Sequence, residues 1–186
     1  MKPTTINIYS KEIIDFVKIC QEYCLFMESE KKLSKKDFIT KSLDLFPKLY
    51  QYATKLPKLE SVLDEVNEKF VTEQNYNNIH NTILNFLGTS NNYPEVFDPV
   101  WQESDEPVSA SLAENFADIY QDLKNFIILY GIGADEIKND ALWECQNNFE
   151  QFWGQKLVNG LRALHLIQYS DEISEKDPGN ITGNSS

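Results

Sequence analysis

Apolar residues recur every three or four positions along most of the chain, which is the spacing of one face of an α-helix. No segment alternates with period two over the length of a strand. A short helix over residues 58–71 is also compatible with the pattern. We therefore expect an all-α fold, a single-domain bundle of six or seven helices. The core helices are predicted over residues 10–30, 34–56, 72–87, 111–130, 135–152 and 157–167.

Helix signals and breakers refine these limits. Ser111 with Glu114 has the S-x-x-E spacing of a capping box, so a helix should begin there. Pro47 removes a backbone donor inside the second helix and predicts a kink or two shorter helices. Trp153 and Gly154 predict a break before the last helix. The residues of that last helix that we expect to face inward are Leu157, Val158, Leu161, Leu164 and His165.

Residues 89–110 contain three prolines and form a long, acidic and aromatic connection rather than a helix. Large aromatic side chains concentrate at binding hot spots, so Tyr93, Phe97 and Trp101 are candidate partner-binding residues. The alternative is that these rings pin the connection onto the core. Beyond residue 169 the apolar periodicity ends, which predicts one domain over residues 1–169 and a flexible tail over 170–186.

The chain is strongly acidic, and its charge is unevenly distributed. Its 186 residues carry a formal charge of -12, while apolar residues make up 41% of the sequence, enough for a real core. Residues 1–70 are nearly balanced, so the excess of carboxylates lies in residues 71–186. Such a charge disfavours phosphate backbones and anionic lipid as partners. The odd number of cysteines, all at apolar helical positions, favours a reducing cytoplasm.

Between Lys69 and Lys124 the chain has no basic residue and nine carboxylates. Glu114, Asp118 and Asp122 are spaced four apart, so they lie one above the other on a helix and repel each other unless cations match them. One candidate cation is Arg162, the only arginine of the chain, which lies in an apolar run. Its guanidinium is planar and can form two parallel hydrogen bonds to one carboxylate, which lysine cannot, so its use here suggests a specific carboxylate partner. We expect a structural ion pair between Arg162 and Asp118 or Asp122, with a surface arginine as the alternative.

A divalent metal is the other way to match these carboxylates. The spacing of Glu114 and Asp118 resembles the E-x-x-x-D helix of the all-α nucleoside triphosphate pyrophosphohydrolases. The resemblance implies that an E-x-x-E helix supplies further carboxylates, which Glu65 and Glu68 would provide. A magnesium-dependent nucleotide pyrophosphohydrolase is therefore the enzymatic alternative.

The chain has no G-x-S-x-G motif, no P-loop and no G-x-G-x-x-G motif, and we expect no cofactor. We favour a non-enzymatic protein-interaction module that binds a partner protein. The chain resembles a family of small cytoplasmic bacterial proteins known as a domain of unknown function, which implies an all-helical fold and no established activity. The resemblance is carried by Glu22-Tyr23-Cys24 with Phe26 and Glu28; Phe70-Val71-Thr72-Glu73; Ser111-Leu112-Ala113 with residues 117–124; and Trp153-Gly154 with residues 157–159 and 161–165.

Overall fold

The computed structural model describes residues 7–29, 33–63, 65–94 and 109–170, and it confirms the all-α fold. Within these residues, α5 runs into α6 through a π-helical segment, so six α-helices form five rods. The predicted tail over 170–186 lies outside the described residues except for Ser170. The elements are α1 (Lys11–Met27), α2 (Lys35–Ala53), α3 (Glu73–Leu87), the 3-10 turn η1 (Gly88–Asn91), β1 (Asn92–Pro94), β2 (Ser109–Ser111), α4 (Leu112–Ile132), α5 (Asp135–Asn148), the π segment η3 (Phe149–Trp153) and α6 (Gly154–Gln168).

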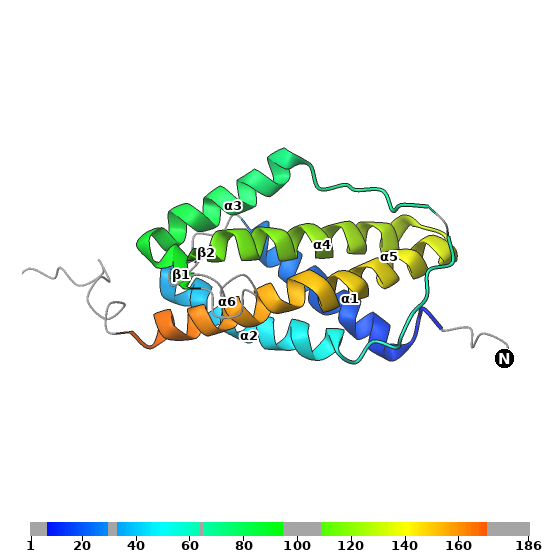
Figure 1. Ribbon diagram of the computed structural model, residues 1–186, viewed down its shortest axis with the longest axis horizontal. Coiled ribbons are helices and arrows are strands. Elements are labelled where there is room, and N and C mark those ends of the chain that lie inside the picture. The colour runs from blue at the N-terminus through cyan, green and yellow to red at the C-terminus, as the bar shows by residue number, and fades with distance from the viewer. Residues whose placement is uncertain (1–6, 30–32, 64, 95–108, 171–186) are drawn as a thin grey trace, which may run out of the picture.

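Helix α4 is the central rod of the bundle and packs against α1, α3, α5 and α6 (Figure 1). Its first turn is fixed as the sequence predicts, because the Ser111 hydroxyl accepts the Glu114 N–H. Buried residues occur on most sides of this helix, in agreement with its wide apolar stripe. Asp118 and Asp122 of α4 therefore emerge between neighbouring helices, whereas Glu114 is exposed.

The core is richest in aromatic rings where α1, α2 and α4 meet. Phe116 of α4 is fully buried, and its ring centroid lies 4.9 Å from that of Phe46 and 5.4 Å from that of Phe38, both on α2. Tyr23 of α1 stacks on the same ring, and its hydroxyl donates to the Phe116 carbonyl oxygen at 2.9 Å. Helix α2 runs through Pro47 as one element and is not divided into two helices.

Helices α5 and α6 are continuous, so the predicted break at Trp153 and Gly154 is wrong. The segment η3 instead adopts π-helical bonding, in which the Gly154 N–H donates to the Phe149 carbonyl oxygen five residues earlier. The Trp153 indole N–H donates to the Cys145 carbonyl oxygen at 3.1 Å. The wider turn changes which side chains face the core, and Phe152 is exposed.

Residues 57–63 and 65–71 form no helix, so the helix predicted over 58–71 is wrong. This extended segment, which we call the strap, leads from α2 around the end of the bundle where α4 turns into α5 and on to α3 (Figure 1). The apolar side chains of Val62 and Val66 in this segment are exposed, Val66 by 91%. Only Leu59 is inserted deeply into the core.

Polar side chains of α4 and α5 hold the strap in place. Buried Asp140 accepts the backbone N–H groups of Val62 and Leu63 at 2.8 and 2.9 Å and the Ser61 hydroxyl at 2.8 Å. Further along, the side-chain oxygen Oδ1 of Asn125 accepts two successive backbone N–H groups, those of residues 70 and 71. Backbone groups that a helix would satisfy internally are thus satisfied by side chains from other elements.

Strands β1 and β2 form a short antiparallel ladder that pairs Tyr93 with Ala110 and Pro94 with Ser109. They fall within the connection predicted over residues 89–110 and are too short to give a period-two signal. The ladder leads directly into α4, where Asn91 accepts the Ala113 N–H at 2.8 Å through its side-chain oxygen. Among the described helices, none is long and apolar enough to cross a membrane.

Candidate functional site

The three carboxylates of the α4 ladder have different surroundings. Glu114 is exposed, whereas Asp118 and Asp122 are half-buried between helices. Asp118 accepts the Tyr76 hydroxyl of α3 at 2.8 Å and forms an ion pair with Lys156 of α6. Asp118 therefore connects three helices and has a structural role.

Asp122 faces α5 rather than α6. Its Oδ1 accepts the Asn148 side-chain N–H at 3.0 Å. Burial raises the pKa of Asp122 to about 6, and the Asn148 hydrogen bond and nearby Lys69 only partly oppose this effect. A carboxylate with this pKa changes its charge close to neutral pH.

The predicted ion pair between Arg162 and Asp118 or Asp122 is wrong. The structure places Arg162 on the exposed side of α6, and the cation beside Asp118 is Lys156. These two basic residues are six positions apart, which on an α-helix separates them by roughly 120° around the axis. Lys156 lies on the side of α6 that faces α4, so Arg162 lies on a different side of the helix.

The metal hypothesis requires carboxylates from two helices to converge. Glu65 and Glu68 lie exposed on the extended strap, so the E-x-x-E helix implied by the pyrophosphohydrolase resemblance is not formed. Within the described part of the chain, no group of three or more His, Cys, Asp or Glu side chains is arranged to hold a metal ion. These residues therefore give no geometric support to the hydrolase alternative.

The cysteine and histidine side chains are not placed for nucleophilic or acid–base catalysis. Cys20, Cys24 and Cys145 are free and buried, and burial raises the pKa of Cys24 to about 12, so it stays protonated at neutral pH. His80 stacks beside Tyr76, and His165, which we had expected to face inward, is exposed beside the Tyr169 ring.

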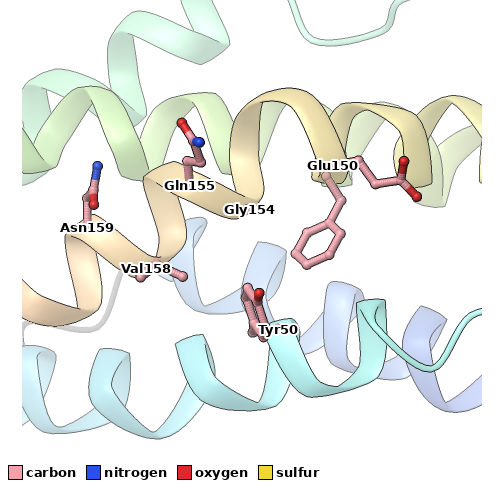
Figure 2. A pocket seen from close by; sticks show the side chains of 7 residues that line it. Tyr50, Glu150, Gly154, Gln155, Val158 and Asn159 are labelled. Carbon is pink, nitrogen blue, oxygen red and sulfur yellow. The ribbon is translucent and has the colours of Figure 1, made fainter. Parts of the chain in front are cut away.

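A groove lies between α2 and the start of α6. Its cavity volume is about 390 Å³. Figure 2 shows Tyr50 on α2 pointing toward the stretch of α6 that carries Gly154 and Val158. The Tyr50 ring meets the Phe149 ring edge-on at 5.2 Å. The residues that line this groove are Tyr50, Phe149, Glu150, Gly154, Gln155, Val158 and Asn159.

The groove owes its shape to two glycines. At Gly160, α2 and α6 approach so closely that a Cβ atom would lie 2.9 Å from the Phe46 ring. At Gly154, a Cβ atom would lie 2.4 Å from the Phe149 carbonyl oxygen and 2.9 Å from its ring. The π turn thus brings Phe149 over a residue without a side chain, and π turns are frequent at functional sites.

A second, smaller hollow lies farther along α6 and shares Asn159 with the groove. Its lining includes Tyr93, Pro94, Arg162 and Leu166. Of the predicted partner-binding residues, Tyr93 is therefore beside α6, where it is half-buried and its hydroxyl accepts from the Asn115 amide. Phe97 and Trp101 lie outside the described residues.

Val158, Arg162 and Leu166 are spaced four apart and define what we call the α6 face. The exposed fractions are 46% for Val158 and 61% for Leu166, and Tyr50 across the groove is 41% exposed. Neither Tyr50 nor Phe149 was predicted from the sequence to line a site, and Val158 was predicted to face inward. A signal was present at Trp153 and Gly154, but it indicated a π turn rather than a break.

The comparisons with known proteins agree with this architecture. A family model described as domain of unknown function (DUF5063) matches residues 7–170. The crystal structure of protein BF1032 from Bacteroides fragilis is 37% identical in sequence and superimposes with a TM-score of 0.78, covering 88% of this chain and 96% of that one. No curated protein matches the chain at a significant level. By both the extent of the family match and the likeness to this structure, the chain belongs to the DUF5063 family.

Proposed function

We propose that this protein is a non-enzymatic protein-interaction module that receives apolar side chains of a partner protein in the groove between α2 and α6. The observation that carries the proposal is the groove itself, with its large exposed apolar residues Tyr50 and Val158. Exposed apolar side chains that gather around a concavity mark interaction sites, whereas those scattered singly do not.

The chemistry of the lining supports binding rather than catalysis. The apolar part of the lining consists of Tyr50, Phe149 and Val158, and the lining also includes the amide side chains of Gln155 and Asn159. Amide groups accept and donate hydrogen bonds to a peptide backbone without transferring protons. An apolar floor with a few polar groups at the rim is the usual composition of a binding site.

The extent of the surface also supports the proposal. The groove and the second hollow meet at Asn159, so a partner segment lying along α6 would contact both. Such a segment would reach Tyr93, Arg162 and Tyr50, and tyrosine and arginine are among the residues that dominate interface energetics. The proposal thus keeps Tyr93 as a partner-binding residue and adds the α6 face.

Site-specific photocrosslinking in cells that produce the protein tests this proposal. With p-benzoylphenylalanine in place of Val158, irradiation should yield a discrete adduct of higher mass, identified by mass spectrometry. The matched control places the same group at Leu25 of α1, which is 68% exposed and far from the groove in sequence. Position 25 should give no such adduct. The proposal fails if positions 50, 158 and 166 give no adduct, or if all give the same products as position 25.

A further inference from the structure

Resting on the proposed function, we infer that the partner segment bound along the α6 face is acidic, with apolar side chains and a carboxylate that pairs with Arg162. The net charge of -12 by itself would favour a basic partner. Among the described residues of this face the charged group is Arg162, whose sign is opposite to that of the whole molecule. A docked segment meets this local charge.

Helix α6 contains no aspartate or glutamate, unlike every other α-helix in the described residues. Its two basic residues have different environments. Lys156 points to α4 and is neutralised there by Asp118. Arg162 is exposed, and no carboxylate in the described part of the chain forms an ion pair with it. Arg162 therefore offers an unused positive charge at the surface.

The surroundings of Arg162 suit a bidentate contact with a carboxylate. It lies in a hollow with Tyr93, Pro94 and Leu166, and Val158 lies one helical turn before it. These neighbours would exclude water from a docked ion pair, which strengthens it. The guanidinium presents parallel N–H groups that match both oxygens of one carboxylate, a geometry that lysine does not reproduce. This is the only place where the chain uses arginine.

The excess of carboxylates lies in residues 71–186, and the exposed carboxylates of α3, α4 and α5 would repel such a segment. Helix α6 carries no carboxylate, and its face presents Arg162 instead. Glu150 lies at the far rim of the groove and limits the acidic part of the partner to the end that contains Arg162. The segment would thus place its apolar residues beside Tyr50 and its carboxylate beside Arg162.

A random library of 12-residue peptides displayed on phage, selected against the full-length protein, tests the inference. Enriched peptides should combine aspartate or glutamate with large apolar residues. The most enriched peptide is then synthesised with a fluorophore, together with a variant in which each Glu or Asp is replaced by Gln or Asn. The affinity of the unmodified peptide, measured by fluorescence anisotropy, should be at least tenfold lower for the Arg162→Gln protein than for the parent. The loss should be smaller for Arg162→Lys. The control is Lys18→Gln, which removes the same charge from an exposed side chain of α1. This substitution should leave the affinity unchanged.

A double-mutant cycle separates a direct ion pair from a general effect of charge. Neutralising the peptide carboxylates should weaken binding to the parent protein tenfold or more and should have little effect on the Arg162→Gln variant. Equal losses for both proteins would overturn the inference. Because Arg162 is exposed, the variant should retain the parent helical circular dichroism spectrum.

The outcomes distinguish the inference from the proposed function. One outcome is that enriched peptides are neutral or basic, bind Arg162→Gln as well as the parent and fail to bind Val158→Asp. In that case the proposed interaction site is supported, and the inference that the partner segment is acidic is wrong. If no peptide is enriched, or binding survives both substitutions, the site itself is wrong. Binding of single-stranded RNA to the parent protein, and its loss in the Arg162→Gln variant, would also overturn the inference that the partner is an acidic protein segment.

Discussion

The aromatic core between α1, α2 and α4 and the strap around the end of the bundle are stabilised by different kinds of contact. In the core, the ring of Phe116 meets the rings of Tyr23, Phe38 and Phe46, and burial of apolar surface dominates. In the strap, backbone N–H groups are accepted by side chains such as Asp140 and Asn125. The core contacts are non-directional, whereas the strap contacts depend on individual polar atoms.

This difference implies different consequences of damage. A core side chain is shared by several helices, so its removal weakens the whole bundle and lowers global stability. A strap anchor serves one exposed segment, so its removal should release that segment while the helices stay folded. Of the four predictions below, the first two test this contrast directly, and the other two extend it to the π turn and to the contact between α4 and α5. They run from the largest expected effect to the smallest.

Replacement of Phe116 by alanine should lower the free energy of unfolding by about 3–5 kcal/mol, because a fully buried ring leaves a cavity among three others. Urea denaturation followed by circular dichroism measures the loss. The matched control is Phe152→Ala, which removes the same ring from an exposed position and should change stability little. Equal losses in the two variants would show that α4 does not carry the core.

Replacement of Asp140 by alanine should cost about 2–3 kcal/mol, because it leaves the Val62 and Leu63 N–H groups without their acceptor. Hydrogen exchange at these two amides should accelerate far more than exchange in α4. Although burial by itself raises a carboxyl pKa, hydrogen bonds from Val62, Asn139, Ser61 and Leu63 bring the pKa of Asp140 below its ordinary value.

The lowered pKa of Asp140 adds a pH dependence to this prediction. A group whose pKa is lower in the folded state stabilises the fold above its ordinary pKa, and this stabilisation is lost as the pH falls through its folded value. The strap should therefore be released in acid before the core unfolds. The prediction is contradicted if amide exchange in the strap and in α4 accelerates together.

Replacement of Gly154 by alanine should cost roughly 1–3 kcal/mol, because its Cβ atom would overlap the Phe149 carbonyl oxygen and ring. The π turn would have to rearrange, and binding in the groove should weaken. Gly131→Ala is the control: it lies within α4 and its Cβ atom would meet nothing within 4 Å. That substitution should raise stability by about 0.4–1 kcal/mol. Thermal denaturation compares the two, and equal shifts would contradict the close approach at Gly154.

Replacement of Asp122 by asparagine should raise stability at pH 7 by roughly 1–2 kcal/mol, since the raised pKa makes the ionised form unfavourable in the fold. Between about pH 4 and 6 the folded protein retains this proton while the unfolded chain has lost it. Stability should therefore fall as the pH rises through this window, and Asp122→Asn should flatten the fall. Glu114→Gln, on the same helix but exposed, is the control and should leave the pH profile as it is in the parent.

The contrast between core and strap also explains how much of the fold could be predicted from the sequence. Apolar spacing located the core helices because a buried helix face has a fixed period, as in the run that contains Phe116. The strap was mistaken for a helix because Leu59, Val62 and Val66 match that period by chance. The polar anchors Asp140 and Asn125 lie about 55 to 80 positions from their strap partners, a separation that local patterns do not report.

The candidate site could be predicted only in part, for a similar reason. Tyr93 was identified from composition, and it does lie beside the α6 face. Arg162 was correctly singled out as unusual, but its assignment to Asp118 failed because the choice between Lys156 and Arg162 depends on the rotation of α6 about its axis. The groove at Tyr50 depends on the π turn, and a single π turn leaves no repeating pattern of apolar residues by which the sequence would reveal it.

The ladder between β1 and β2 has a practical consequence for protein engineering. Pro94 and Ser109 are held opposite each other by this ladder, so the two positions that flank residues 95–108 lie close together. Because the entropy of loop closure grows slowly, by about 0.6 kcal/mol for each doubling of length, the chain should tolerate large inserts between these positions. A fluorescent reporter whose own ends lie close together could be spliced there, next to α6, and its emission would respond when a ligand occupies the neighbouring surface.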